Sequence, residues 1–448
     1  MKPSENPLGS EPVSTLLRRF AVPSVIAMLV SALYNMVDQL FIGHSIGVLG
    51  NAATNVAFPL SMVCTSIGLL CGIGGAANFN LCMGRREPEH AKSYVGSAIS
   101  MLAILGVILC VAVQLFLHPM MLLFGATPDV IDYACTYTRI TSIGFPFLIV
   151  TIGGSNLIRA DGSPKFSMLC NLVGAIVNTI LDPLFIFGFG WGIRGAAIAT
   201  VLAQILALVW QFRIFSDRNE LLHFRRGIYR LKGKIVRNVL AIGMSPFLMN
   251  LAACFIVILI NKGLKEYGGD LNIGAYGIVN RLGFFFVMIV MGINQGMQPI
   301  AGYNYGARQF DRVDRVLKLT IIGATCVTTL GFLIGELAPR LAVSVFTDDP
   351  ELVRLSAEGM RIVFFCFPII GFQMVTTNFF QSIGMASKAI FLSVSRQVLI
   401  LIPCLLILPQ FYGQLGVWIS MPISDLIASL IAGTMLWWQF KQFRKVSV

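Results

Sequence analysis

Long apolar runs with few charges alternate with short polar segments along the whole chain. Each run reaches the roughly 20 residues that a helix needs to cross the hydrocarbon core of a bilayer. The runs lack the alternation of apolar and polar positions that marks the strands of a membrane barrel. They therefore predict an all-α integral membrane protein with twelve spans, near Leu17–Ile42, Ala52–Met83, Ser93–Leu117, Tyr133–Ala160, Phe166–Phe189, Ile193–Phe215, Val239–Lys262, Ile273–Gly302, Val316–Leu337, Leu355–Ile383, Ala389–Leu408 and Gly416–Phe440.

The polar segments divide the chain into five predicted parts. These are an N-terminal tail (1–15), an N-lobe of helices 1–6 (16–215), a basic linker (216–238), a C-lobe of helices 7–12 (239–440) and a C-terminal tail (441–448). The first apolar run is too long for the core of a signal peptide and has no small-residue cleavage site, so we expect it to be retained as a span.

The two lobes repeat each other. A shift of 222 positions aligns Gly84 with Gly306, Arg86 with Arg308, Pro128 with Pro350, Phe145–Pro146 with Phe367–Pro368, and Asn156 with Asn378. Because six spans return the chain to the side where it began, the repeats predict two parallel six-helix bundles related by a pseudo-two-fold axis along the membrane normal. An alternating-access transporter has this layout, whereas a pore or a membrane enzyme does not require it.

Composition and charge agree with a membrane protein. The chain is 56% hydrophobic and 12% charged, whereas a soluble protein is about 25% charged. Of the 33 Lys and Arg, 24 lie in the tails and the even-to-odd loops and 5 in the opposite loops. Since such an excess marks the cytoplasmic side, we expect both termini and the linker to be cytoplasmic. The net charge of +12 then reports topology rather than nucleic-acid binding, and membrane lipid is the partner that it suggests.

Three acids sit well inside spans: Asp38, Asp182 and Asp425. An acid at mid-membrane costs about 2.5–3.5 kcal/mol on insertion scales, and a functional role is its default explanation. Asp38 in span 1 and Asp182 in span 5 lie about 6 and 10 Å below the predicted outer ends, at 1.5 Å per residue. Their similar depths predict a facing pair of carboxylates in the N-lobe.

Two close carboxylates cannot both stay ionised in a low-dielectric site unless a cation joins them. The pair is therefore predicted to act as a switch for H⁺ or Na⁺. Asn178, one turn before Asp182, and Thr200 in span 6 supply further oxygens at this depth. With Na⁺ as the ion, Asp38, Asn178, Asp182 and Thr200 form the expected ligand set. The alternative that each acid pairs with an Arg or caps a helix end remains open.

Asp425 lies about 15 Å into span 12 and has no acidic counterpart in the first half. Either it attracts a cationic substrate or it pairs with Arg281 or Arg396. The chain contains no Walker A sequence, HExxH or nucleophile elbow, so the sequence predicts neither an enzyme nor a cofactor other than the coupling ion.

Three segments together resemble the multidrug and toxic compound extrusion (MATE) family, in its DinF/MepA-like branch. They are Tyr34-Asn-Met-Val-Asp38-Gln-Leu-Phe-Ile-Gly43, Asn156-Leu-Ile-Arg-Ala-Asp-Gly162 and Asn178-Thr-Ile-Leu-Asp182-Pro183. The resemblance implies that Asp38, Asn178, Asp182 and Thr200 bind the coupling cation, with Tyr34, Tyr137 and Asn156 in the surrounding polar network. It also implies that span 1 bends at Pro23.

The chain departs from the NorM branch, which carries acids in spans 7 and 10 of the C-lobe, since span 7 and the core of span 10 (Val363–Ile383) have none here. We therefore expect coupling to rest on the N-lobe. The implied function is cation-coupled efflux of amphipathic organic cations, such as drugs and dyes, by a monomer in the inner membrane of a prokaryote.

Other classes of function remain as alternatives. A flippase for lipid or lipid-linked saccharide shares the architecture, and would gain support if the four intramembrane arginines face the cleft; these are Arg139, Arg281, Arg361 and Arg396. A sugar porter of the facilitator type should carry a more basic loop between spans 2 and 3 than Gly84-Arg-Arg-Glu-Pro-Glu-His90. A membrane transferase should show a His/Asp/Glu cluster at one membrane face, and the sequence has none.

Overall fold

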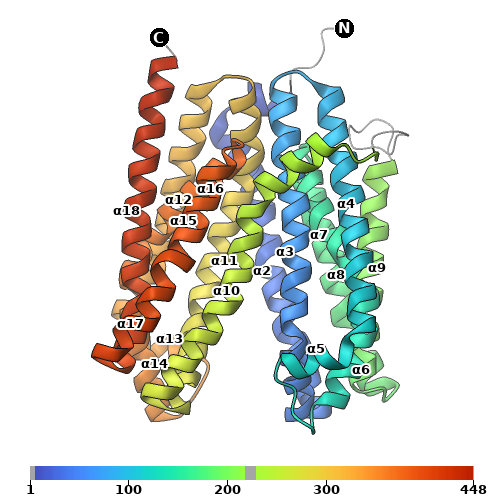
Figure 1. The fold of residues 1–448 in the computed structure, drawn as a ribbon, viewed down its shortest axis with the longest axis vertical. Coiled ribbons are helices and arrows are strands. Elements are labelled where there is room, and N and C mark those ends of the chain that lie inside the picture. The colour runs from blue at the N-terminus through green and yellow to red at the C-terminus, as the bar shows by residue number, and fades with distance from the viewer. Residues whose placement is uncertain (1–5, 217–228, 447–448) are drawn as a thin grey trace. The chain divides into compact units, whose positions relative to one another are not determined.

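The computed structural model describes residues 6–216 and 229–446, which form helices and no strands (Figure 1). Twelve helical segments in this part of the chain are long and apolar enough to cross a membrane, which confirms the all-α fold and the number of spans. Their bounds are α2 Val13–Ile46, α3 Val48–Gly84, α4 Pro88–Leu115, α6–η1–α7 Ile131–Ala160, α8–η2 Pro164–Gly188, α9 Ile193–Ser216, α10 Gly233–Gly268, α11 Asp270–Gly306, α12 Phe310–Leu337, α14–η3–α15 Pro350–Ser382, α16–η4–α17 Ala386–Tyr412 and α18 Gln414–Val446.

The helix ends lie further out than several predicted span ends. Helix α10 begins at Gly233, inside the predicted linker, and α18 continues into the predicted C-terminal tail as far as Val446. A short helix, α1 (Pro7–Ser10), and the start of α2 occupy part of the predicted N-terminal tail. Hydropathy marks only the length buried in lipid, whereas backbone hydrogen bonds continue the helix into water. Residues 217–228 of the linker lie outside the described residues.

Irregular elements recur in both halves of the chain. Helix α6 (Ile131–Thr141) is joined to α7 (Phe145–Ala160) by a 3₁₀ turn, η1 (Ser142–Gly144), and α14 (Pro350–Val363) is joined to α15 (Phe367–Ser382) by another, η3 (Phe364–Cys366). Arg86 and Arg308 both have positive φ, of 61° and 58°. The 222-residue repeat of the sequence is therefore also a repeat of backbone conformation.

Each half also contains a π-helical segment next to a buried charged residue. Segment η2 (Leu184–Gly188) follows α8 (Pro164–Pro183), and η4 (Ser395–Leu401) joins α16 (Ala386–Val394) to α17 (Ile402–Tyr412). The remaining short helices are α5 (Leu117–Leu123) and α13 (Pro339–Ser344). Because π-segments widen a helix locally and frequently occur at functional sites, they direct attention to the charged groups beside them.

The chain forms two compact units whose boundaries fall inside helices α2 and α10. The N-unit is Ile26–Phe247, and the C-unit is Met1–Val25 with Leu248–Val448. The first part of α2 therefore belongs to the C-unit, and the first part of α10 belongs to the N-unit. Pro23 lies two residues before Val25 and Pro246 one residue before Phe247, and each proline removes one helical hydrogen bond.

Close backbone contacts hold these helix parts in place. A Cβ at Gly243 of α10 would overlap the carbonyl oxygen of Leu70 in the N-unit. In the C-unit, a Cβ at Gly296 of α11 would lie 2.6 Å from the Cα of Ala21 in α2. Small residues let membrane helices approach this closely, so glycine at these positions sets which helices pack together.

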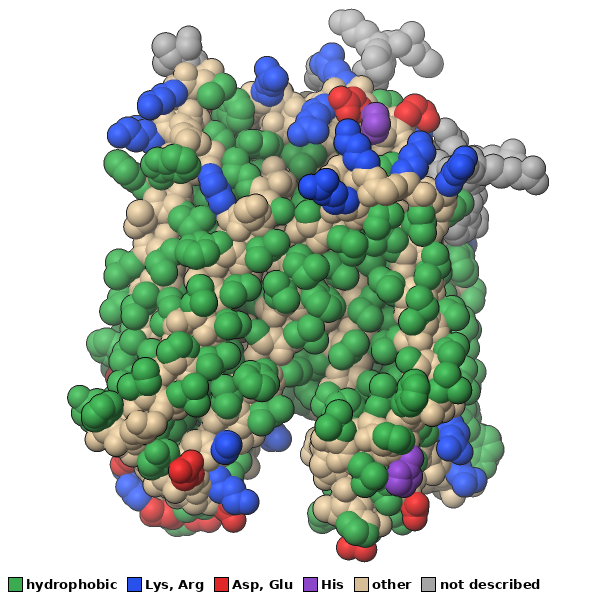
Figure 2. All heavy atoms as spheres, in the orientation of Figure 1, with side chains coloured by type: hydrophobic (Ala, Val, Ile, Leu, Met, Phe, Trp, Pro, Cys, Tyr) green, Lys and Arg blue, Asp and Glu red, His purple; other side chains and the backbone are tan. Residues whose placement is uncertain are grey.

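Hydrophobic side chains cover the middle of the helices in each unit, as Figure 2 shows, while charged side chains gather at the helix ends. In each unit taken by itself, Lys and Arg gather at the end that carries the loop after α3 in the N-unit and the loop after α11 in the C-unit. This is the pattern of a protein whose apolar belt lies in lipid and whose charged ends lie in water.

Candidate cation site in the N-unit

The structure brings together the two acids that the sequence paired. Asp38 lies on α2 and Asp182 in the last turn of α8, directly before Pro183 and the π-segment η2. The two carboxyl groups lie close enough to interact with each other. Asp182 is completely buried (0% exposed), so at least one of these groups has no contact with bulk water.

Asn178 and Thr200 also lie where they were expected relative to one another. The Asn178 side chain donates from Nδ2 to Oγ1 of Thr200 over 3.3 Å, and the Thr200 hydroxyl donates to the carbonyl of Ala196 over 3.0 Å. Asn178 is 1% exposed and stands one turn before Asp182 on α8. The amide is therefore held with its nitrogen toward α9, which leaves its carbonyl oxygen free.

Four buried oxygens of this group accept no hydrogen bond within the described part of the chain. They are Asp38 Oδ1, Asn178 Oδ1, Asp182 Oδ1 and Asp182 Oδ2. Buried polar atoms are nearly always satisfied, and burying an unsatisfied acceptor costs free energy. A set of acceptor oxygens without donors is what a proton or a small hard cation satisfies.

Two tyrosines complete the surroundings of the carboxyl pair. Tyr34 lies one turn before Asp38 on α2, and Tyr137 comes from α6. Both phenol groups are close enough to Asp38 and Asp182 to interact with them electrostatically. Their hydroxyls add polar atoms next to the pair, as the resemblance implied.

Asn156 lies elsewhere in the N-unit. Its side-chain oxygen accepts from Nη1 of Arg159 over 3.1 Å, and Arg159 Nη2 donates to Ser167 Oγ over 3.5 Å. Ser167 precedes Asp182 by 15 positions on α8, or about 22 Å at 1.5 Å per residue. Asn156 is therefore not brought to the carboxyl pair.

Sequence reasoning missed Arg159 and its neighbour network. Arg159 is 5% exposed although it stands near the end of α7, where a basic residue is expected to reach water. Gln211, 0% exposed, donates to the Thr151 carbonyl (2.7 Å) and to Ser155 Oγ (3.1 Å). The available signal was the polar content of the segment from Thr151 to Arg159, which is unusual for a span facing lipid.

Asp425 belongs to the C-unit and has a basic partner. Arg396, within the π-segment η4, donates from Nε to Asp425 Oδ1 over 3.1 Å, and its Nη2 lies 3.1 Å from the same oxygen. Of the two alternatives that the sequence left open, pairing with Arg396 is the one observed. The flippase alternative relied on four intramembrane arginines, and one of them, Arg396, is occupied by this ion pair. The side chains of the other three, Arg139, Arg281 and Arg361, are exposed.

Twelve spans in two repeated halves, with a buried acid pair and no enzyme motif, are the features of a membrane transporter. The sequence profile of the MatE family matches residues 23–184 and 243–406, one segment in each half. The chain belongs to the MatE family and is a transporter, not an enzyme.

Relatives match along almost the whole chain. The multidrug export protein MepA of Staphylococcus haemolyticus is 26% identical over 418 residues, covering 93% of this chain and 91% of the relative. The solved structure of the MATE multidrug transporter DinF-BH is 36% identical, with a TM-score of 0.90 and 98% coverage of both chains. These matches confirm the DinF/MepA type of MATE transporter.

A more distant structure shows the same fold. An outward-facing multidrug resistance MATE transporter of the MOP superfamily is 21% identical, with a TM-score of 0.92 over all of both chains. Together with the twelve apolar helices, the staphylococcal relatives identify this chain as a multi-pass protein of the bacterial plasma membrane.

Proposed function

We propose that this protein is a cation-coupled multidrug efflux antiporter that exports amphipathic organic cations, with H⁺ or Na⁺ as the coupling ion. The observation that carries the proposal is the set of buried acceptor oxygens around Asp38 and Asp182. The multidrug export function of the MepA relatives supports the substrate class. We further propose that it acts as a monomer in lipid, with both termini in the cytoplasm.

The coupling step follows from the charge of the pair. Without a cation, two carboxylates repel each other in a site that is largely shielded from water; a proton or Na⁺ between them removes that repulsion. Asn178 and Thr200 offer neutral oxygens that suit Na⁺ without preventing protonation. The pair therefore favours different local geometries with and without its cation.

An antiporter needs the cation to bind one conformation better than the other, and each tenfold shift in population requires about 1.4 kcal/mol. Pro23 is the proposed hinge. It lies 15 residues before Asp38 on the same helix α2, so a change at the acid pair acts on the helix that contains the hinge. The 33 Phe and 19 Met supply soft side chains that can repack around varied drugs.

The test uses inverted vesicles or proteoliposomes with an imposed ΔpH or ΔNa⁺, and ethidium as the transported cation. The wild type should transport ethidium under one of the two gradients. Asp38→Asn and Asp182→Asn keep the side-chain shape and remove the charge, so each should lower gradient-driven transport at least about tenfold, equivalent to about 1.4 kcal/mol.

Ethidium binding to the purified resting protein should persist in both variants. Asp129→Asn, which changes an exposed acid between α5 and α6, is the matched control and should transport normally. Wild-type transport by Asp38→Asn would contradict the assignment of the coupling site. Failure of both gradients in the wild type, together with movement of a labelled lipid, would support the flippase alternative.

A further inference from the structure

A pocket of about 600 Å³ opens at the end of the N-unit where α2 finishes. Its walls come from three places in the chain: Ser45 on α2, Asp132 and Thr136 on α6, and Trp191 with Arg194 in the corner that leads into α9. One acid and one base thus face the same pocket, and no ion pair joins them among the described residues.

The helices that line this pocket also carry the candidate cation site. Ser45 comes seven residues after Asp38 on α2, or about 10 Å further along the helix. On α6, Asp132 comes five residues before Tyr137, or about 8 Å. The pocket is therefore stacked on the site, nearer to the end of the unit.

A small apolar cluster lies between the two. It consists of Ile42, Ile186 and Ala196, which are 0%, 3% and 0% exposed, with Phe41 and Ile46 packed against it. Ile186 also lines the pocket.

Each member of the cluster is four residues from a site residue, which is about one helical turn. Ile42 follows Asp38, Ile186 follows Asp182, and Ala196 precedes Thr200. Each therefore lies one turn nearer the pocket than the site residue on its own element. Three buried apolar side chains therefore lie at one level, between the pocket and the polar group.

The corner beside the cluster is ordered by its own contacts. The backbone N–H of Trp191 donates to the carbonyl of Phe185 over 3.1 Å, and the ring of Trp191 packs against Phe185 and Phe189 with centroids 5.2 and 5.0 Å apart. This part of the pocket wall is thus held by its own contacts.

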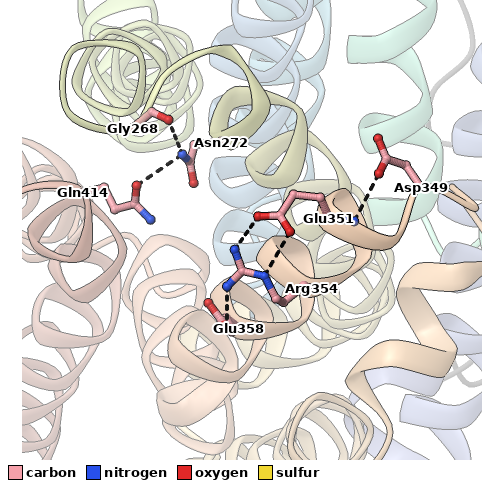
Figure 3. Close-up of polar contacts among 7 residues, drawn as sticks. All are labelled: Gly268, Asn272, Asp349, Glu351, Arg354, Glu358 and Gln414. Atoms are coloured by element: carbon pink, nitrogen blue, oxygen red, sulfur yellow. Dashed lines mark hydrogen bonds and ion pairs between the residues drawn. The ribbon is translucent and has the colours of Figure 1, made fainter.

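The repeated corner in the C-unit is built differently. There, Asn272 donates to the Gly268 carbonyl over 2.5 Å and to Gln414 Oε1 over 3.2 Å, as Figure 3 shows. These bonds tie the start of α11 to the start of α18, next to Gly269 and Gly413, whose positive φ values repeat those of Gly47 and Gly192. The two corners are therefore held by different contacts: aromatic packing in the N-unit and side-chain amide hydrogen bonds in the C-unit.

We propose that this pocket is the outer vestibule through which a monovalent cation, Na⁺ or hydronium, reaches the acid pair, and that Ile42, Ile186 and Ala196 form its apolar gate. The inference rests on the proposed function and on the proposed cytoplasmic position of the termini, which together make the pocket end extracellular. Asp132 attracts the cation at the mouth, while the closed gate prevents hydrated ions from passing when the site is not open to this side.

The first test measures access to the site directly. Thr200→Cys is exposed to a small cationic thiosulfonate reagent from the outside of right-side-out vesicles, and labelling of the peptide containing position 200 is followed by mass spectrometry. Adding Ile186→Ala should raise the labelling rate about tenfold, equivalent to about 1.4 kcal/mol. Ile180→Ala, on the same helix but 62% exposed, should leave the rate unchanged.

Ile42→Ala provides a second opening of the gate in case Ile186→Ala fails to fold, which size-exclusion chromatography reports. Equal labelling rates in folded gate variants and in the Ile180→Ala control overturn the gate. Labelling does not require transport, so this result is independent of whether Asp38→Asn abolishes efflux. If the gate variants raise the labelling rate but the wild type shows no ion-driven efflux, the proposed function is refuted and the proposed access route is still supported.

A second test measures the role of Asp132 at the mouth of the vestibule. Asp132→Asn should raise the external cation concentration that gives half-maximal efflux by about threefold or more, with a maximal rate close to wild type, because it removes charge at the mouth and not at the binding site. Asp129→Asn, a neighbouring exposed acid that does not line the pocket, should not change it. Identical values for the two variants would refute the role of Asp132.

Discussion

The buried charges of the two units are balanced in opposite ways. In the C-unit, Asp425 forms an ion pair with Arg396, so the negative charge is neutralised within the protein. In the N-unit, Asp38 lies beside another acid, Asp182, and the proposed coupling cation would supply the positive charge. A shift of 222 places Ile260 opposite Asp38, and the shift of 223 that aligns Pro23 with Pro246 places Asn261 there, so neither alignment puts an acid at this position. Both halves thus share the helical framework, whereas the acid pair of the proposed cation site lies in the first half of the described chain.

The Asp425–Arg396 pair leads to a prediction about stability. Removing one partner of a buried ion pair leaves an uncompensated charge and typically costs about 3–5 kcal/mol. Asp425→Asn should therefore lower the thermal unfolding midpoint of the detergent-solubilised protein. Arg396→Gln combined with Asp425→Asn should recover part of the loss, since no charge is then left unpaired. A double variant as unstable as the two single variants combined would show that the pair does not act as a unit.

The sequence predicted the acid pair because both acids lie at similar depths in spans that run in the same direction. The resemblance, not the span pattern, put Asn156 near that pair: it lies four residues from the inner end of the predicted span Tyr133–Ala160, and the structure places it with Arg159. Burial of Arg159 was missed because a cation near a helix end is expected to reach water, and only the packing of α7 against its neighbours reveals that it does not.

At the scale of elements, the main surprise is that α2 and α10 each contribute to both compact units. Hydropathy predicts that α2 and α10 are each a single span. It does not predict which neighbouring helices the two ends of such a span contact. Their placement is encoded instead in close contacts such as that of Gly243 with Leu70, which become visible only when helices are packed. The predicted lobes, which meet at the linker 216–238, follow the order of the spans along the chain. The compact units of the structure, which meet at Val25 and Phe247, follow the packing of the helices.

Gly243→Ala tests this close contact. The added methyl group would overlap the Leu70 carbonyl, and overpacking of this kind typically costs about 1–3 kcal/mol. The variant should unfold at a lower temperature than the wild type. Gly277→Ala is the control, because a Cβ at Gly277 in α11 meets no other atom within 4 Å and alanine favours a helix over glycine. Equal loss of stability in the two variants would contradict the importance of the contact.

At the scale of the whole molecule, the transport direction depends on which end of the helices faces the cytoplasm. The excess of Lys and Arg in the tails and even-to-odd loops predicts that this end is cytoplasmic. Glu87, in the loop between α3 and α4, and Asp129, between α5 and α6, are exposed residues at opposite ends of the N-unit. If the orientation is as proposed, only Asp129 faces the medium outside the cell.

Cysteine labelling in intact cells distinguishes the two orientations. Asp129→Cys should react with a membrane-impermeant maleimide applied outside, and Glu87→Cys should react only after the membrane is permeabilised, each compared with the parent protein, whose native cysteines set the background. The reverse pattern would place the vestibule and its gate on the cytoplasmic side. The acid pair would then receive its cation from the wrong side for efflux driven by an inward ion gradient, so this measurement bears on the direction of transport as well as on topology.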